Sequence, residues 1–425
     1  MNELKPTLTL VQGLGLLTSA LLGTGVFMLP ELTVRTSGGN ALWGWMVLIL
    51  AILPVALSFG QLGRRFPHAG GASHFVELAF GKLQGRIVGW LFLALLPVGL
   101  PAAMEMAVWF LGSLVSMSDA QQVMAKVLLL LMMMAVNLRG IKLSGAIQTT
   151  ISVTVCSVIF LLTWLAIDDS GPTAATRYNP FTADSLEMGA VAAAAALAFW
   201  SFIGVEALAH VSSEFKNPQR DFPLALIIGV LIVGLVYSLG TWLVLSYPGS
   251  LSPDTPAMVI LFDKLIGPWG GLCIGLFGFL SCVATMNIYH ASASRMLWSL
   301  ARGGDAPRML EKLNRQQAPV NSVIAMTVVC LISLLISSSL NMSLEGLIML
   351  SNGIVVLIYI MTMMAAIRLL SRWRKLLAAG GMLICVWLAV TLAASMLYAG
   401  VLYVSLWIWF RSRYLGEADL MGNGV

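Results

Sequence analysis

The stretch "LLGTGVFMLP", residues 21–30, lies inside a long apolar run where an uninterrupted helix is expected. It nevertheless groups Gly23, Thr24 and Gly25 together and adds Pro30. In a helix interior, glycine costs about 1 kcal/mol relative to alanine and proline costs about 3 kcal/mol. Two interpretations are open: the small residues let neighbouring helices pack closely, or the helix unwinds here and exposes its backbone.

The composition of the whole chain is that of a membrane protein. Its 425 residues are 59% hydrophobic and only 10% charged, whereas soluble proteins contain about 25% charged residues. A helix needs roughly 20 mostly apolar residues to cross a bilayer, and only helices and closed barrels satisfy their backbone in lipid. The sequence therefore predicts an all-α integral membrane protein of about twelve transmembrane helices. The expected spans are residues 10–34, 41–62, 87–114, 123–136, 143–167, 186–211, 224–245, 269–297, 320–336, 344–370, 376–392 and 397–410.

The distribution of basic residues tests this count of spans. With the N-terminus placed in the cytoplasm, 20 of the 24 Lys and Arg residues fall in cytoplasmic segments. The four exceptions are Arg35, Lys126, Arg177 and Lys264. Basic residues are retained on the cytoplasmic side, and one missed span would invert every later loop. The split predicts that both termini are cytoplasmic, and it explains the net charge of +5 without a nucleic-acid surface.

Several other classes of site have no signature in the chain. The five cysteines lie in apolar runs without a CxxC pair or a zinc spacing, so no disulfide framework or metal site is expected. No P-loop of an ATP-driven motor and no nucleophile–base constellation of an enzyme is visible. We therefore expect no metal, no cofactor and no enzymatic activity.

A second interrupted run, "AFWSFIGVEALAH" at residues 198–210, lies in the sixth expected span. It contains Gly204 and, two residues later, the carboxyl group of Glu206. Ionisable groups inside a membrane are costly, and by default they indicate a functional site. This second stretch favours the interpretation that both runs are broken helices.

The two interrupted spans, the first and the sixth, predict an internal repeat. Five spans separate the starts of the two units, and an odd number of spans inverts the second unit relative to the first. Paired breaks in an inverted repeat are the best sequence indication of a transporter's binding site. Within a single transmembrane domain, we expect repeats at residues 10–167 and 186–370, followed by two additional helices at 376–410.

Three motifs resemble those of the amino acid–polyamine–organocation transporter superfamily. "LLGTGVFMLP" is similar to its first-helix motif, and "RRFPHAGGASHFVELAFG" (64–81) to the loop between its second and third helices. "FWSFIGVEALAHVSSEFKNPQRDFPLA" (199–225) resembles its sixth helix and the following loop. "GWLFLALLPVGLPAAMEMA" and "SEFKNPQRDFP" are most similar to the enterobacterial inner-membrane branch that exports L-methionine and branched-chain amino acids. The resemblance covers nearly the whole chain and implies two inverted five-helix repeats plus two peripheral helices.

The resemblance also implies a substrate site on the two broken helices. The backbone of the first break, with the Thr24 hydroxyl, would bind the carboxylate and amine of an amino acid. On the sixth helix Trp200 matches a gating aromatic residue, and Glu206 matches a buried acid that is the candidate for proton coupling. The residues placed at the site in this way are Leu21, Gly23, Thr24, Gly25, Trp200, Ile203, Gly204, Glu206, Tyr289 and Asn352.

Alternative roles stay open for several of these polar and aromatic residues. Trp200 could pack in the core, and Glu206 could be a structural hydrogen-bond acceptor. Glu105, in the third span, could line a vestibule or lie at the membrane interface. His210 and His290 could be helix-end histidines whose ring nitrogens are satisfied by hydrogen bonds, or they could be members of a proton relay.

The predicted function is secondary active transport of neutral apolar amino acids by alternating access in the cell inner membrane. Methionine and branched-chain substrates, and their export, come from the resemblance. The proton gradient is the expected energy source, and sodium stays open as the coupling ion. The alternatives are an antiporter or importer of another substrate, since "WSFIGVE" also resembles arginine–agmatine exchangers, and a channel. The oligomeric state is not predicted.

Overall fold

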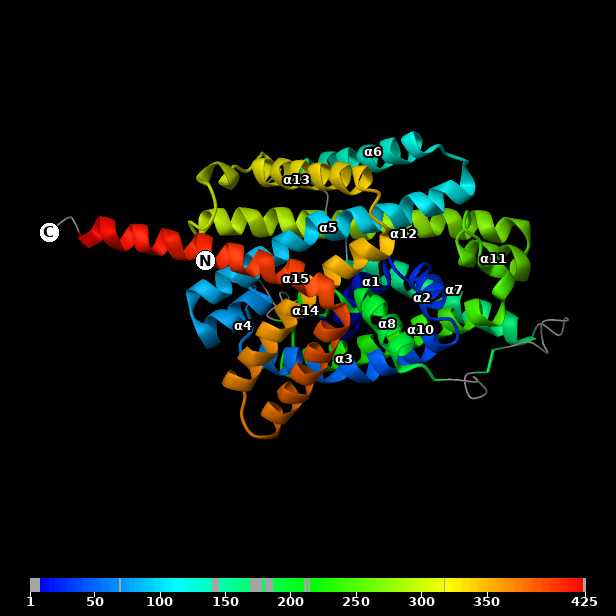
Figure 1. Cartoon of the computed structure of the whole chain (residues 1–425), viewed down its shortest axis with the longest axis horizontal. Helices are drawn as coiled ribbons and strands as arrows, with labels where there is room; N and C mark the ends of the chain where they lie inside the picture. Colours follow the sequence, from blue (N-terminus) through cyan, green and yellow to red (C-terminus); the bar gives the residue numbers. More distant parts are fainter. Residues whose placement is uncertain are drawn as a thin grey trace.

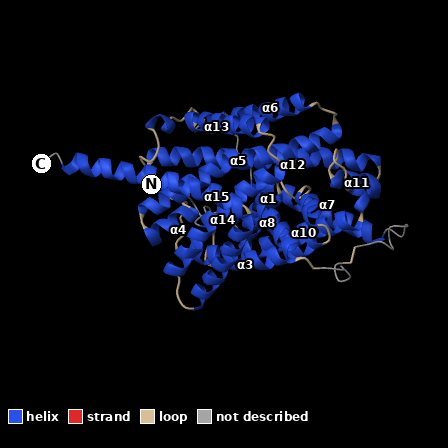
Figure 2. Cartoon of the chain, viewed as in Figure 1, coloured by secondary structure: helices blue, strands red, loops and turns tan. Residues whose placement is uncertain are grey.

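The structure is a computed structural model that describes residues 8–68, 70–139, 145–168, 178–179, 186–209, 212, 215–316 and 318–422. Over these ranges the chain is helical, and its β-structure is limited to two isolated bridges (Figure 2). The α-helices are α1 (Leu10–Leu22), α2 (Leu29–Ser37), α3 (Asn40–Arg65), α4 (Gly71–Phe80), α5 (Lys82–Leu114), α6 (Asp119–Leu138), α7 (Gly145–Asp168), α8 (Met188–Ala198), α9 (Val205–Ala209), α10 (Asp221–Ser246), α11 (Ala257–Ile266), α12 (Pro268–Arg302), α13 (Val320–Ser339), α14 (Leu344–Leu369) and α15 (Trp373–Gly422). Three 3₁₀ helices join them: η3 (Phe199–Phe202), η5 (Pro248–Ser250) and η6 (Arg308–Glu311). The all-α class is confirmed.

The described helices agree with the predicted number of membrane spans. Nine of them are long and apolar enough to cross a membrane. Eight of the nine match single predicted spans, and the ninth, α15, covers the last two spans across a kink at Ala393. The first and sixth spans are divided into shorter pieces, α1 with α2 and α8 with η3 and α9.

The order and the lengths of the helices recur along the chain. Helices α3 and α10 each have 26 residues, α4 and α11 each have 10, and α6 and α13 each have 20. Both short helices end at a glycine with positive φ, Gly81 at 89° and Gly267 at 107°, directly before the long helices α5 and α12. Helices α4 and α11 lie at opposite ends of the molecule (Figure 1). This correspondence supports the proposed inverted repeat.

The two broken spans are enclosed by the other helices. Helix α1 packs against α7 and α10, and α8 packs against α2, α3 and α14. Small residues allow close contact here: a Cβ on Gly44 of α3 would lie 2.5 Å from the Cβ of Ala194 of α8. Close packing through glycine thus occurs beside the breaks, as is usual for membrane helices.

Candidate functional site

The first break covers residues 23–28, between the end of α1 at Leu22 and the start of α2 at Leu29. The turn is closed by the N–H of Val26, which donates to the Leu22 carbonyl at 3.1 Å. Among the backbone hydrogen bonds of the described residues, none is donated by the N–H groups of Thr24 and Gly25. The predicted unwinding of the first span is confirmed, and it leaves backbone donors available in the protein interior.

Side chains from two other helices bind the carbonyl groups that this break releases. The Tyr237 hydroxyl of α10 donates to the Leu21 carbonyl at 3.0 Å, and the Ser281 hydroxyl of α12 donates to the Gly23 carbonyl at 2.9 Å. A Cβ on Gly23 would lie 1.9 Å from Oγ1 of Thr285, so glycine is needed for this approach. Tyr237 and Ser281 were not predicted, because hydroxyl side chains in apolar spans give no signal of their partner.

The second break lies between η3 and α9. Ile203 is extended, with ψ at 116°, and Gly204 has φ at +128°, where side chains other than glycine are strained. The Tyr289 hydroxyl of α12 donates to the Ile203 carbonyl at 3.2 Å. A Cβ on Gly204 would lie 3.1 Å from Cδ2 of Leu21. The sixth span is therefore broken as predicted, and its break lies against the first.

Glu206 is fully buried directly after the second break. Both of its carboxyl oxygens lie 3.0 Å from the donating N–H group of Gly204. The Tyr359 hydroxyl of α14, also fully buried, contacts Oε2 of Glu206 and lies 3.1 Å from the carbonyl oxygen of Phe202. No Lys or Arg forms an ion pair with Glu206 among the described residues. Tyr359 is the α14 residue at the breaks, and the sequence did not identify it.

The hydrogen bonds of Tyr359 depend on the protonation of Glu206. A phenol has one proton to donate, and the Phe202 carbonyl can only accept. If Tyr359 donates to Phe202, its contact with Oε2 requires a proton on the Glu206 carboxyl group. If Glu206 is ionised, Tyr359 donates to it instead, and the Phe202 carbonyl loses this donor. One proton on Glu206 therefore changes the bonding of the second break.

Three predicted site residues keep partial exposure between the two breaks. Thr24, Trp200 and Tyr289 are half-buried, whereas Leu21 and Ile203 beside them are buried. Nε1 of Trp200 donates to Oγ1 of Thr24 at 3.3 Å, which joins the sixth span to the first. Apart from the buried Glu206, the side chains that contact the breaks in the described part of the chain are uncharged.

Asn352 lies away from the breaks. Its Nδ2 donates to the Ala196 carbonyl of α8 at 2.7 Å, and its buried Oδ1 has no hydrogen-bond partner. It lies seven residues, or about two helical turns, before Tyr359 on α14. The contact ties α14 to the helix that leads into the second break.

His290 is a buried residue of α12, directly after Tyr289, and it is part of a cluster of polar side chains. The Thr327 hydroxyl donates to the Val323 carbonyl at 2.8 Å, so it accepts from Nε2 of His290, which is 3.0 Å away. Asn137 donates through Nδ2 to Oδ1 of Asn287 at 2.9 Å, and that nitrogen lies 3.3 Å from Nδ1 of His290. This pattern assigns a neutral ring with the proton on Nε2. Both ring nitrogens are thus paired, which favours a structural role.

Glu105 and His210 are the remaining residues whose roles the sequence left undecided. Glu105 of α5 forms an ion pair with Lys126 of α6, and the Lys126 side chain is only 6% exposed. The pair therefore neutralises a lysine that is buried between two helices. His210 lies outside the described residues.

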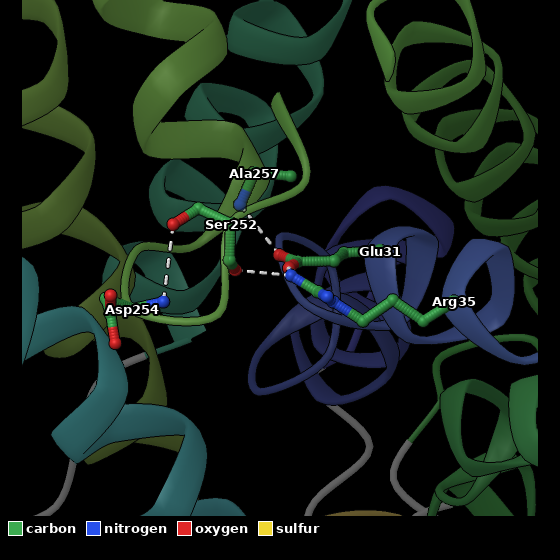
Figure 3. Close-up of polar contacts among 5 residues, drawn as sticks. All are labelled: Glu31, Arg35, Ser252, Asp254 and Ala257. Carbon is green, nitrogen blue, oxygen red and sulfur yellow. Dashed lines mark hydrogen bonds and ion pairs between the residues drawn. The ribbon is translucent and has the colours of Figure 1, made fainter. Parts of the chain in front are cut away.

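A further buried carboxylate, Glu31 of α2, joins the first broken span to the start of α11 (Figure 3). The Ala257 N–H donates to Oε2 of Glu31 at 2.7 Å, and Nη2 of Arg35 lies 2.6 Å from Oε1. Arg35 also donates to the Ser252 carbonyl. In the sequence Arg35 is only one of the four basic residues outside the cytoplasmic segments, so this connection was not predicted.

The chain matches known transport proteins over most of its length. Residues 8–413 match the amino acid permease family. The chain is 38% identical over 432 residues to the L-methionine/branched-chain amino acid exporter YjeH of Escherichia coli (strain K12), which covers 100% of both chains. It is 29% identical over 378 residues to the uncharacterized amino acid permease YecA of Bacillus subtilis (strain 168), covering 88% of this chain and 87% of that one. The cadaverine/lysine antiporter of Escherichia coli (strain K12) is 24% identical over 319 residues, which are 72% of this chain and 69% of the antiporter.

Replacement of Tyr359 by Phe is expected to destabilise the protein more than replacement of Tyr289 by Phe. The first change removes the buried phenol that lies between the Phe202 carbonyl and the Glu206 carboxyl group, so one buried polar partner is lost at a cost of about 1–3 kcal/mol. The second removes one hydrogen bond, to the Ile203 carbonyl, from a residue that is only half-buried, so we expect about 0.5–1.5 kcal/mol. Unfolding of both variants in detergent by increasing SDS measures the difference, and the reverse order would contradict the role of Tyr359.

Proposed function

Because this chain belongs to the amino acid permease family, we propose that it exports L-methionine and the branched-chain amino acids Leu, Ile and Val across the inner membrane. Family membership makes it a membrane transporter and not an enzyme. The choice of substrate and direction is supported by the full-length similarity to an L-methionine/branched-chain amino acid exporter at 38% identity. The similarity to the cadaverine/lysine antiporter is weaker and covers less of the chain.

The observation that carries this proposal is the pair of facing breaks at the centre of the molecule. The N–H groups of Thr24 and Gly25 have no backbone acceptor and lie before the N-terminus of α2, where the helix dipole favours a carboxylate. The Thr24 hydroxyl and nearby carbonyl groups are suited to the substrate's ammonium group. This set of backbone and hydroxyl groups is common to all amino acids, so it recognises the class of substrate.

The surroundings of the breaks favour a neutral substrate side chain. The partly exposed groups there are Thr24, Trp200 and Tyr289, which are uncharged. Glu206 is buried and already occupied by Gly204 and Tyr359. A lysine, arginine or diamine would therefore lack a free carboxylate for its distal cation among the described residues. This argues against the exchanger alternative.

We propose that transport proceeds by alternating access and is driven by the proton gradient, with Glu206 as the coupling group. Its protonation decides whether the Tyr359 hydroxyl donates to the Glu206 carboxylate or to the Phe202 carbonyl. A proton can thus change the backbone contacts of the second break without a new charged partner. Sodium stays the alternative coupling ion.

We also propose the cytoplasmic placement of both termini. The support is the charge distribution, with 20 of 24 basic residues on one side of a twelve-span chain. In this topology α4 lies on the cytoplasmic side and α11 on the periplasmic side, in keeping with their positions at opposite ends of the molecule (Figure 1).

Overproduction of the protein is expected to lower intracellular methionine and leucine, and to raise both outside, in cells loaded with dipeptides that contain them. Amino acid analysis of cells and medium measures this export. The matched control is Gly23→Val, since any Cβ at this position would lie 1.9 Å from Oγ1 of Thr285. If methionine and leucine stay unchanged while arginine or a polyamine moves, the exchanger alternative is correct.

A reporter enzyme that is active only in the periplasm is expected to be silent when fused after Val425 and active when inserted near residue 171. The reason is the retention of positively charged segments in the cytoplasm. Reporter activity, corrected for the amount of fusion protein, is the measurement. The opposite pattern would exclude the proposed topology.

Substitution of Glu206 is expected to separate its two proposed roles. Glu206→Ala should abolish transport, because it removes the group that binds the Gly204 N–H and the Tyr359 hydroxyl. Glu206→Gln keeps the shape and hydrogen-bonding capacity but cannot ionise, so exchange should persist without its pH dependence.

Counterflow of radiolabelled methionine in liposomes, across a pH series, measures both properties. Glu187→Gln is the control, because it makes the same chemical change at an exposed residue. If Glu206→Ala inserts normally and transports like the parent, the assignment of Glu206 to the site is wrong.

A further inference from the structure

Main-chain atoms join the two broken spans at the ends that are cytoplasmic in the proposed topology. The N–H of Lys216, in the segment that follows α9, donates to the carbonyl of Leu8, just before α1, at 2.8 Å. The same contact is a parallel β-bridge between Leu8 and Phe215. The start of the first broken span is therefore bonded directly to the segment that leaves the second.

The Phe215 side chain packs this backbone contact against α1. Its ring is fully buried, and a Cβ on Gly13 of α1 would lie 2.3 Å from its Cζ atom. The ring of Phe222, on α10, packs edge-on against it, with the ring centres 5.7 Å apart. The backbone contact is thus part of a packed unit that includes α1 and the start of α10.

Helix α1 contacts the second broken span at both of its ends. At the break, a Cβ on Gly204 would lie 3.1 Å from Cδ2 of Leu21, and at the other end Leu8 bonds to Lys216. The two contacts are separated by α1, whose 13 residues span about 20 Å. Helix α1 also packs against α9. A helix that is held at two distant points against one partner cannot turn away from that partner unless one of the contacts breaks.

We propose that the backbone contact between Leu8 and Lys216 makes α1 and α9 move as one unit when the transport site opens to the cytoplasm. The inference rests on the proposed alternating access. Because α1 and α9 stay together, the opening forms where α9 packs against α4. Gly13 and Phe215 act in this movement as positioning residues, since they hold the unit together without touching the substrate.

Hydrogen exchange of the purified full-length protein, measured by mass spectrometry, tests the backbone contact. Lys216→Pro removes the N–H donor, and the extended backbone of Phe215 is compatible with a proline after it. We expect exchange of α1 to rise about fivefold, the effect of one lost hydrogen bond. Lys216→Ala keeps the N–H and should match the parent. Lys82→Pro is the second control, because it makes the same change at the first residue of α5, where proline is accepted.

The reverse variant, Gly13→Ala, tests the ring from the side of α1. The new Cβ forces the Phe215 ring to move, although alanine favours the helix itself. Exchange of residues 215–222 should therefore rise while the helix gains propensity. Parent-like exchange of α1 in Lys216→Pro, or of residues 215–222 in Gly13→Ala, would overturn the proposal.

A cross-link tests whether the two spans move together. The double variant Leu8→Cys with Lys216→Cys keeps the Phe215 ring, and a short bifunctional thiol reagent joins the two positions. Counterflow of radiolabelled methionine in liposomes should stay within twofold of the unlinked double variant, with the two single variants as controls for the reagent. Loss of transport on linking would show that α1 moves away from α9 and would overturn the proposal. If the parent shows no methionine counterflow, the substrate assignment fails, whereas the hydrogen-exchange measurement still tests the backbone contact.

Discussion

The structure depends on one constraint: a backbone that leaves the helix inside a membrane must find its hydrogen bonds within the protein. Two helices are broken against each other, and their released carbonyl groups bind hydroxyl groups of three other helices. Tyr237 of α10, Ser281 of α12 and Tyr359 of α14 supply these bonds across the centre of the molecule. The broken helices thereby set the positions of the helices around them, and the N–H groups left over form the substrate site proposed here.

The charged residues inside the protein follow the same constraint, and each has defined partners. Glu31 binds Arg35 and a backbone N–H, Lys126 pairs with Glu105, and only Glu206 lacks a cationic partner among the described residues. A carboxyl group that is bound by a phenol and an amide can exist with or without its proton at a smaller cost than one bound to an arginine. This difference distinguishes the acid proposed for coupling from the acids that hold helices together.

The sequence alone predicts the features that depend on composition and on residues that interrupt a helix. Hydropathy and the basic residues predict the spans, and Gly23, Gly25 and Gly204 mark both breaks. It was not sufficient for the residues that bind the breaks, because helical periodicity indicates only which face is buried. Tyr237 and Tyr359 therefore look like ordinary core aromatics, although the hydroxyl of each lies within hydrogen-bond distance of a carbonyl group more than 150 residues away in the chain. The short helix α11 was missed for a related reason, since ten residues are too few to be read as a span.

The contact of Glu31 with α11 has a consequence for how the chain can change over time. Glu31 binds the main-chain amide of Ala257, and Arg35 binds the main-chain carbonyl of Ser252. Every amino acid except proline supplies the amide, and every amino acid supplies the carbonyl. The loop before α11 can therefore vary in sequence while the attachment persists. The attachment depends on only two side chains, Glu31 and Arg35 of α2.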